Sequence, residues 1–244
     1  MKIHRFAVML AVLSVVLAGF SGLGVRVAWW PYAVGFTLLR WVVGLGLAAI
    51  VCGVIGLVIP RWRSGVVLPL VVSIVLGAAA GWLPWQLSQQ AKSLPRIHDI
   101  STDLINPPPF VDVMPLRASA PNPAVYGGAQ VAAAQRTAYP DIQPLLLNET
   151  SDRAYVLALA EAKKADWDIV AQDPQHGRIE ATATTFWFGF KDDIVIRITP
   201  VDGRTRIDMR SVSRVGKSDL GKNAARIRST LASLAHAAAS APAK

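Results

Sequence analysis

The first 95 residues of this 244-residue chain contain no aspartate or glutamate, although residues 96–244 contain all 16. The same 95 residues hold 7 of the 25 lysines and arginines, so most of the net charge of +9 comes from a segment without acidic residues. Residues 96–244 carry only +2. Basic residues beside apolar segments set membrane topology, whereas a nucleic-acid surface concentrates them on a folded domain. The charge distribution therefore argues against a nucleic-acid partner.

Cysteine is almost absent, because Cys52 is the only one in the chain and it lies in an apolar run. Residues 96–244 therefore form no internal disulfide and no cysteine metal site. The histidines show no ligand spacing of the H-x-x-x-H kind; they are His4, His98, His176 and His236. We expect no metal, no cofactor and no catalytic residue on this evidence.

Long uncharged apolar runs are present instead, at residues 6–25, 41–60 and 65–85. Each has about 20 residues, which is enough to cross a hydrocarbon core of about 30 Å. Tryptophan and tyrosine gather at the ends of the runs, as is typical of the headgroup level of a bilayer. We predict three membrane-spanning helices within a membrane region of residues 1–95, with the lipid bilayer as partner. The absence of charge inside the runs argues against a transporter or channel.

The basic residues of the short loops predict the orientation. Placing the N-terminus and the loop between the second and third runs in the cytoplasm puts four basic residues inside and two in the first outer loop. Residues 96–244 then face the outside of a bacterial inner (cytoplasmic) membrane, which is the periplasm. Residues 6–25 have a second interpretation as a cleaved signal peptide, and that interpretation leaves the same domain outside.

A GxxxG pattern in the third run is formed by Gly77 and Gly81. Small residues at this spacing let another helix approach closely. We expect packing within the chain here, and a homo-oligomer through Gly77 and Gly81 is the second interpretation.

The remaining chain predicts an α+β domain at residues 96–236, followed by a disordered tail at 237–244. We expect an antiparallel sheet of four to five strands that carries two helices on one face. Proline recurs through residues 106–144, which predicts an extended strap with a looser part near 117–135. A helix that Thr150 or Ser151 caps and short strands near 167–171 and 178–188 follow. The last helix is expected from residue 219, with Ser218 as its cap.

Residues 190–214 predict a β-hairpin. Asp202 and Gly203 suit the two central positions of a tight turn, where positive φ is needed. Every cross-strand pair then sums to 405, so Arg197 lies opposite Asp208 and Asp192 lies opposite Ser213. The hydrophobic alternation gives the same register as the turn does. Arg197 and Asp208 form an ion pair in this register.

Four charged residues of the hairpin are expected to form a structural polar cluster, namely Asp192, Asp193, Arg197 and Asp208. Neighbouring strand residues point to opposite faces, so Asp192 and Asp193 do not form one catalytic dyad. The alternative interpretation is a hydrolase that uses Asp192, Asp208 and a serine of the stretch 210–214. No histidine base is evident for it.

The C-terminal part of the chain is basic, with 9 basic and 2 acidic residues between 204 and 244. A helix N-terminus with basic neighbours favours anions. We therefore expect an anion or ligand site at Arg210, Ser211, Ser213, Arg214, Lys217 and Lys222. The alternative is a solvated basic face. A nucleotide phosphate loop is excluded, because Ser211 stands where that motif needs its first glycine.

Three separated motifs resemble a bacterial family catalogued as domain of unknown function 1499. They are "IHDISTDLINPPPF" at 97–110, "YPDIQPL" at 139–145 and "IEATATTFWFGFKDDIVIRI…RIDMRSVSRVGKSDLGKNAARIR" at 179–228. The resemblance implies that residues 97–110 belong to the domain, and it supplies no activity. It implies motif positions at Asp99, Asp103, Asp141, Asp192, Asp193, Arg197, Asp208, Arg210, Ser211, Ser213, Arg214, Asp219 and Asn223.

The interpretation that these observations favour is a membrane-anchored envelope protein with a non-enzymatic binding or scaffolding domain. Its expected partner is an anionic envelope component or an envelope protein.

Overall fold

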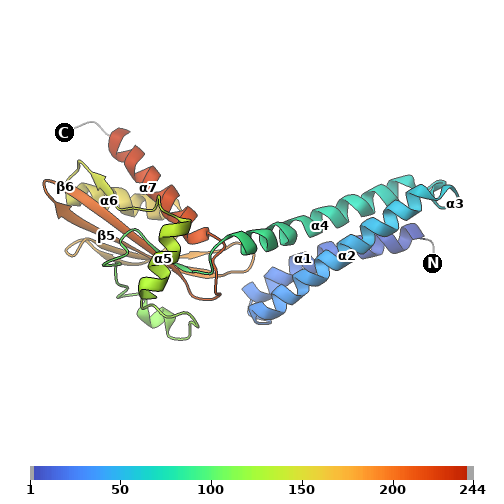
Figure 1. Cartoon of the computed structure of the whole chain (residues 1–244), viewed down its shortest axis with the longest axis horizontal. Coiled ribbons are helices and arrows are strands. Elements are labelled where there is room, and N and C mark those ends of the chain that lie inside the picture. Colours follow the sequence, from blue (N-terminus) through green and yellow to red (C-terminus); the bar gives the residue numbers. More distant parts are fainter. Residues whose placement is uncertain (1–2, 241–244) are drawn as a thin grey trace. The chain divides into compact units, whose positions relative to one another are not determined.

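A computed structural model describes residues 3–240 of the chain (Figure 1). The chain divides into two compact units. The first comprises Met1–Ser93 together with Phe186–Gly189, and the second comprises Leu94–Thr185 together with Phe190–Lys244. Each unit is described on its own.

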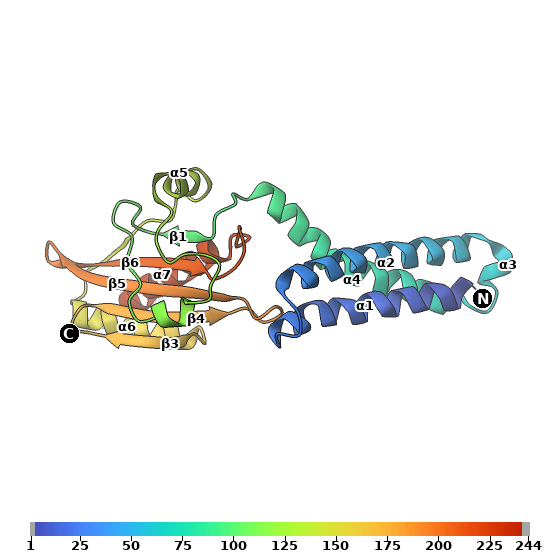
Figure 2. The ribbon, with the colours of Figure 1, turned by 90° about the horizontal axis from the view of Figure 1, so that it is seen from below.

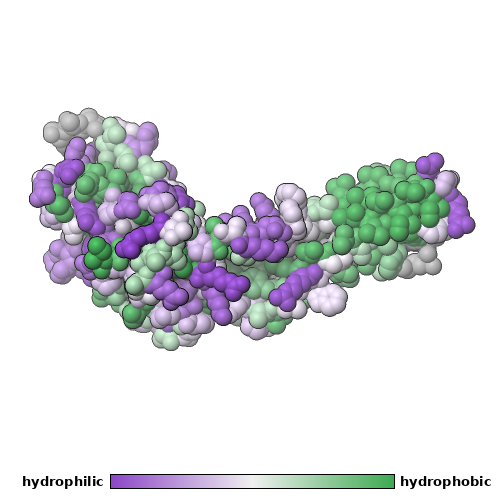
Figure 3. All heavy atoms as spheres, in the orientation of Figure 1, coloured by the Kyte–Doolittle hydropathy of each residue, from purple (hydrophilic) through white to green (hydrophobic). Residues whose placement is uncertain are grey.

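The first unit is a bundle of three long helices, α1 (Ile3–Arg26), α2 (Tyr32–Val58) and α4 (Val67–Ser93). The short helix α3 (Pro60–Arg63) follows α2. All three long helices have the length and hydropathy to cross a membrane. Hydrophobic residues gather over this unit in the space-filling view (Figure 3), as expected for helices whose outer surface meets lipid. The protein is therefore a membrane protein.

All three helices are longer than the apolar runs that predicted them, α2 and α4 most of all. Helix α2 begins at Tyr32 rather than near residue 41, so it contains Arg40, which is exposed. Helix α4 continues to Ser93 rather than ending near residue 85. The physical reason is that an apolar run marks only the part of a helix that lies in the hydrocarbon core. The hydrogen bonds of the helix continue beyond that part, into the headgroup region.

Small residues bring α2 and α4 close together. A Cβ atom added at Gly77 would lie 2.6 Å from the carbonyl oxygen of Gly46, so these two positions require glycine. A Cβ atom added at Gly81 would meet nothing within 4 Å. Gly77 is thus used inside the bundle, in agreement with packing within the chain. A homo-oligomer through Gly77 and Gly81 stays a prediction.

The second unit is built on an antiparallel sheet (Figure 2). Its strands are β1 (Asp99–Ser101), β2 (Leu145–Leu147), β3 (Asp168–Asp173), β4 (Arg178–Thr184), β5 (Lys191–Val201) and β6 (Arg204–Ser213). Their order is β1-β6-β5-β4-β3, and β2 pairs with β6 beside β1. The sheet is therefore five positions wide, and the predicted α+β class is confirmed.

The predicted β5–β6 hairpin is confirmed residue by residue. Asp202 and Gly203 have φ angles of 49° and 73°, as a two-residue turn of the primed type requires. Arg197 pairs with Asp208 and Asp192 pairs with Ser213. The predicted strand at 178–188 is shorter, because β4 ends at Thr184 and residues 186–188 form a turn.

One face of the sheet packs against two helices, α6 (Ser151–Lys164) and α7 (Lys222–Ser240). Alternate isoleucines of the strands fill this core, and Ile227 and Leu234 of α7 are fully buried against them. Thr150 caps α6 by accepting a hydrogen bond from the Arg153 amide. We call this side of the sheet the helix face.

The opposite side of the sheet is covered by residues 102–126, which we call the strap, and this side is the strap face. Phe110 and Val113 of the strap pack against Val195 and Val212. The strap includes a short 3₁₀ helix at Met114–Arg117.

The prediction of a looser part near 117–135 is wrong. Arg117 is buried, and residues Gly128–Ala138 form the helix α5. The Gln135 side chain accepts a hydrogen bond from the Ser101 amide at 3.0 Å and donates one to the Ser101 carbonyl at 2.6 Å. This pairing fixes α5 to the edge strand, which composition alone does not reveal.

The last helix begins later than predicted. Leu220 and Gly221 both have positive φ, of 53° and 76°, so the chain is not helical before Lys222. Asp219 takes the capping role expected of Ser218, because its Oδ2 accepts a hydrogen bond from the Asn223 amide at 2.6 Å. The tail prediction is wrong for residues 237–240, which belong to α7, while 241–244 lie outside the described residues.

Candidate functional site

Asp193 is a fully enclosed acidic group of the strap face, with a side chain that is 0% exposed. It accepts hydrogen bonds from Arg214 at 2.7 and 2.8 Å, from the Thr182 hydroxyl at 2.7 Å and from Arg117. Burial alone would raise the pKa of Asp193, but these hydrogen bonds outweigh it and hold the pKa below its ordinary value. Asp193 is thus an ionised group that ties the strap to β5 and β6.

Arg210 forms a second buried pair on the same face. Its guanidinium binds Asp99 through two hydrogen bonds of 2.7 and 2.9 Å and also donates to the backbone carbonyls of Pro108 and Ala124. It lies 5.1 Å from the ring centre of Phe110 and 5.5 Å from that of Tyr126.

The pKa of Tyr126 is raised to about 12 by burial and by nearby Asp99, although Arg210 opposes the shift. Four of the five N–H groups of Arg210 donate to Asp99, Pro108 and Ala124, so its role is to hold the strap.

The predicted pair of Arg197 and Asp208 is present, with a shortest distance of 2.9 Å. Asp208 is 1% exposed, because the strap covers it, so the pair is buried rather than on an open sheet surface. Arg206 and Asp103 complete a cluster of two cations and two anions. Burial would raise the pKa of Asp103, but the backbone amides of 105 and 106 and the two arginines hold it below its ordinary value.

Glu180 is the buried acidic residue of the strap face that the sequence patterns did not single out. Its two carboxylate oxygens accept hydrogen bonds from the backbone amides of Val111 and Val113, at 2.8 and 2.9 Å. Arg178 lies 3.3 Å away. The strap-face carboxylates therefore share one task, which is to attach the strap to the sheet.

A separate polar cluster lies on the helix face. Asp192 accepts a hydrogen bond from Arg226 at 2.7 Å, and Arg226 also donates to the Ser211 hydroxyl at 2.9 Å. Asn223 accepts from Ser211 at 2.8 Å and donates to Ser213 at 3.1 Å. The sequence predicted that Asp192 lies opposite Ser213 in a structural polar cluster, and it missed Arg226 as the main partner of Asp192.

The hydrolase interpretation requires Asp192, Asp208 and a serine to act together. Asp192 and the serines 211 and 213 lie on the helix face, whereas Asp208 lies on the strap face. The sheet separates the two carboxylates, and each is already bound by arginine. This geometry argues against a catalytic site built from these residues.

The predicted anion site is divided in the same way. Arg210 and Arg214 bind buried carboxylates of the strap face, while Ser211 and Ser213 belong to the helix-face cluster. Lys217 and Lys222 are exposed. The structure therefore does not bring the six residues together around one ligand position.

Asp219 lies beside Tyr139 at the start of α7. Burial raises the pKa of Asp219, and nearby Asp192 adds to the shift, although the amides of Asn223 and Gly221 donate to the carboxylate. The Tyr139 hydroxyl is buried and has no hydrogen-bond partner among the described residues. Asp219 and Tyr139 both lie next to Leu220 and Gly221, the two residues with positive φ that precede α7.

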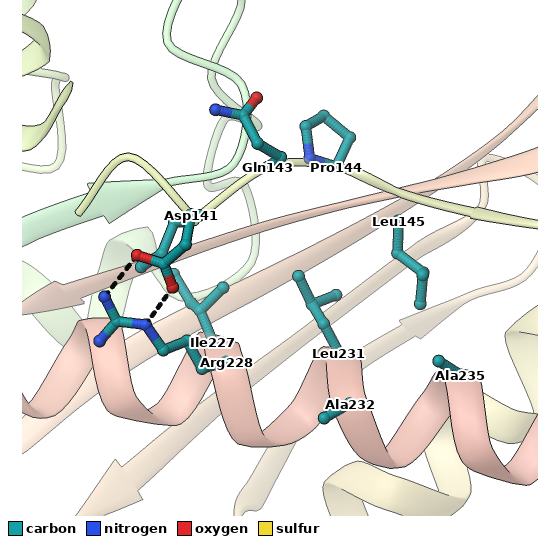
Figure 4. Close-up of a pocket in the computed structure, with 10 residues that line it drawn as sticks. Asp141, Gln143, Pro144, Leu145, Ile227, Arg228, Leu231, Ala232 and Ala235 are labelled. Atoms are coloured by element: carbon teal, nitrogen blue, oxygen red, sulfur yellow. Dashed lines mark hydrogen bonds and ion pairs between the residues drawn. The ribbon is translucent and has the colours of Figure 1, made fainter.

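A groove of about 350 Å³ runs along α7 (Figure 4). Segment 141–145 forms one wall, and Ile227, Leu231 and Ala235 of α7 form the other. Arg228 and Asp141 form an ion pair at one end of the groove. The lining is otherwise mostly apolar, so the groove suits apolar groups rather than acid–base chemistry. Within residues 3–240, no group of three or more histidine, cysteine or carboxylate side chains is arranged to hold a metal ion.

These features define a membrane-anchored protein with an α+β domain whose charged motif residues are structural. The family described as "Protein of unknown function (DUF1499)" matches residues 99–234, and the chain belongs to this family. A search of curated proteins found no match.

Proposed function

We propose that this protein is a non-enzymatic binding module, anchored in the bacterial inner membrane with its α+β domain in the periplasm. The observation that carries the proposal is that the charged motif residues are bound to one another. The strap-face arginines and carboxylates fasten the strap, and Asp192 is bound by Arg226. A domain of this kind presents a rigid surface, and the charged groups that fasten the strap or bind Arg226 are engaged in structural contacts rather than free for acid–base chemistry.

We assign the binding of a protein partner to the groove beside α7. Its walls offer Leu145, Leu231 and Ala235 to apolar side chains, and the Asp141–Arg228 pair at the rim offers charge of both signs. An apolar centre with a polar rim is typical of protein-binding surfaces.

The test is a photo-crosslinking amino acid placed at Ala232, which is exposed and lines the groove. The matched control position is Ala160 on α6, which is also exposed. We expect the crosslinker at Ala232 to capture a partner in intact cells, and the crosslinker at Ala160 to capture none. The variant Leu231→Arg should abolish the crosslink from Ala232. Crosslinking that is equal at both positions, or that persists with Leu231→Arg, would contradict the groove.

The numbers of basic residues in the short loops support the periplasmic location. Four basic residues flank the ends assigned to the cytoplasm and two flank the first outer loop. With three spans, Ser93 and the domain after it lie on the outer side.

A further inference from the structure

The helical bundle has one end at which α1 begins, α3 lies and α4 begins (Figure 1, Figure 2). Three arginines are exposed there, Arg5 at the start of α1 and Arg61 and Arg63 in α3. We call this the arginine end. Figure 3 shows hydrophilic residues at this end, next to the hydrophobic surface of the bundle. A positively charged surface therefore adjoins the part of the bundle that meets lipid.

The arginines of this end have no carboxylate partner. Residues 1–95 contain no aspartate or glutamate, and every ion pair of residues 3–240 lies between residues 99 and 228. The first turns of α1 and α4 also lack an acidic residue, so the partial positive charges of these helix ends add to those of the arginines. The positive charge of the arginine end is therefore left for an anion from another molecule to neutralise.

An aromatic side chain stands among these charges. Trp62 lies between Arg61 and Arg63 and is 37% exposed, and the Arg61 guanidinium carbon lies 5.4 Å from the centre of its ring. Tryptophan favours the headgroup level of a bilayer, because its ring is apolar and its N–H group is polar. Leu68 at the start of α4 is 74% exposed, so the apolar surface of the bundle begins beside the charged loop.

We infer that the arginine end binds anionic lipid headgroups, with Arg5, Arg61 and Arg63 against the phosphates and Trp62 at headgroup level. Charge complementarity supports this occupant, because the surface is cationic, has no counter-ion of its own and adjoins the membrane-spanning surface. A guanidinium group also donates two parallel hydrogen bonds to a phosphate. In the proposed orientation these lipids belong to the cytoplasmic leaflet. The inference goes beyond the proposed function and does not depend on the groove.

Bound lipid differs from a topology signal in a way that can be measured. Basic loop residues set the orientation of the helices during insertion, whereas bound anionic lipid stays beside the inserted protein. The purified full chain should therefore enrich anionic lipid around the arginine end, in a bilayer whose two leaflets are the same.

The experiment places the full chain in nanodiscs of phosphatidylcholine and phosphatidylglycerol. In a Cys52→Ala background, a fluorophore at Ser64→Cys reports on the arginine end, because Ser64 is exposed and directly follows Arg63. A small fraction of the lipid carries a spin label, on either phosphatidylglycerol or phosphatidylcholine. We expect spin-labelled phosphatidylglycerol to quench the fluorophore roughly twofold more than spin-labelled phosphatidylcholine, because each basic residue at the surface favours anionic lipid.

The arginines are tested by changing Arg5, Arg61 and Arg63 to glutamine together, which should bring the ratio of the two quenching values to about 1. Changing the same three residues to lysine keeps the charge and should retain most of the preference. The matched control replaces three exposed cations of the second unit with glutamine and should leave the ratio unchanged. These cations are Lys163, Lys164 and Arg204.

Equal quenching by the two spin-labelled lipids, or a preference that the glutamine variant keeps, would overturn the inference. Inorganic phosphate should reduce the preference no more than sodium chloride of the same ionic strength does. A larger effect of phosphate would show a site for a soluble anion and would also overturn it. The proposed function fails separately, because loss of the crosslink from Ala232 leaves the lipid preference standing, and equal quenching leaves the groove untouched.

Discussion

Arg117 and Asp193 form an ion pair between the strap and the sheet, across 76 residues of sequence, and their side chains are only 3% and 0% exposed. Arg214 binds the same carboxylate from β6. One anion therefore joins three segments of the domain. Buried charges are tolerated at this position because each one is hydrogen-bonded and paired.

Replacing Asp193 with alanine should destabilise the domain strongly. The change leaves Arg117 and Arg214 without their carboxylate, and breaking a buried pair costs about 3–5 kcal/mol. Asp141→Ala is the control, because its pair with Arg228 is exposed and should be worth about 0–1 kcal/mol. Pulse proteolysis of the full chain in urea measures both. Similar losses in the two variants would show that the strap does not depend on Asp193.

Acid should weaken the same attachment. The pKa of Asp193 is held below its ordinary value of 3.8 in the folded domain. Its contribution to the free energy of unfolding is therefore present above pH 3.8 and is lost as the pH falls through the folded pKa. Asp193→Asn should remain less stable than the wild type at neutral pH, with a difference that narrows below pH 3.8. A constant difference would contradict the assigned charge state.

Asp219 should show the opposite sign. Burial raises its pKa in the folded domain, so the folded state holds a proton more tightly than the unfolded chain does. Stability from this group is present below pH 3.8 and is lost as the pH rises through the folded pKa. Asp219→Asn keeps a capping oxygen and should flatten the stability profile above pH 3.8. An unchanged slope in that window would refute the prediction.

The helical bundle offers a matched pair of glycine variants. Gly77→Leu places side-chain atoms against the Gly46 backbone and should destabilise the bundle by about 1–3 kcal/mol, the usual cost of overpacking. Gly81→Leu points into open space and should be close to neutral. Thermal unfolding of the full chain in detergent distinguishes them. A change of oligomeric state in Gly81→Leu but not in Gly77→Leu would support a homo-oligomer that forms through Gly81.

The hairpin was predictable from sequence because its two determinants are local. The turn residues Asp202 and Gly203 set the register, and the alternating isoleucines set the buried face. The same register predicted the Arg197–Asp208 pair and placed Asp192 and Asp193 on opposite faces. The membrane helices were predictable because about 20 consecutive apolar residues have few other structural solutions.

The remaining features depend on partners far away in the sequence. Arg117 and Gln135 look like ordinary polar loop residues, yet they bind Asp193 and Ser101 across 76 and 34 residues. The late start of α7 follows from the left-handed backbone at Leu220. Leucine rarely adopts this conformation, so the sequence did not predict it. The anion site failed to form as one group because alternation in β6 sends Arg210 and Ser211 to opposite faces.

Cysteine labelling in intact cells determines on which side of the membrane the domain lies. In a Cys52→Ala background, Gln175→Cys reports on the domain and Ser64→Cys reports on the loop between α3 and α4. After the outer membrane is permeabilised, a membrane-impermeant maleimide should label residue 175 and should reach residue 64 only after lysis. Labelling of residue 64 in intact cells, with residue 175 protected until lysis, would place the domain in the cytoplasm and overturn the proposed orientation.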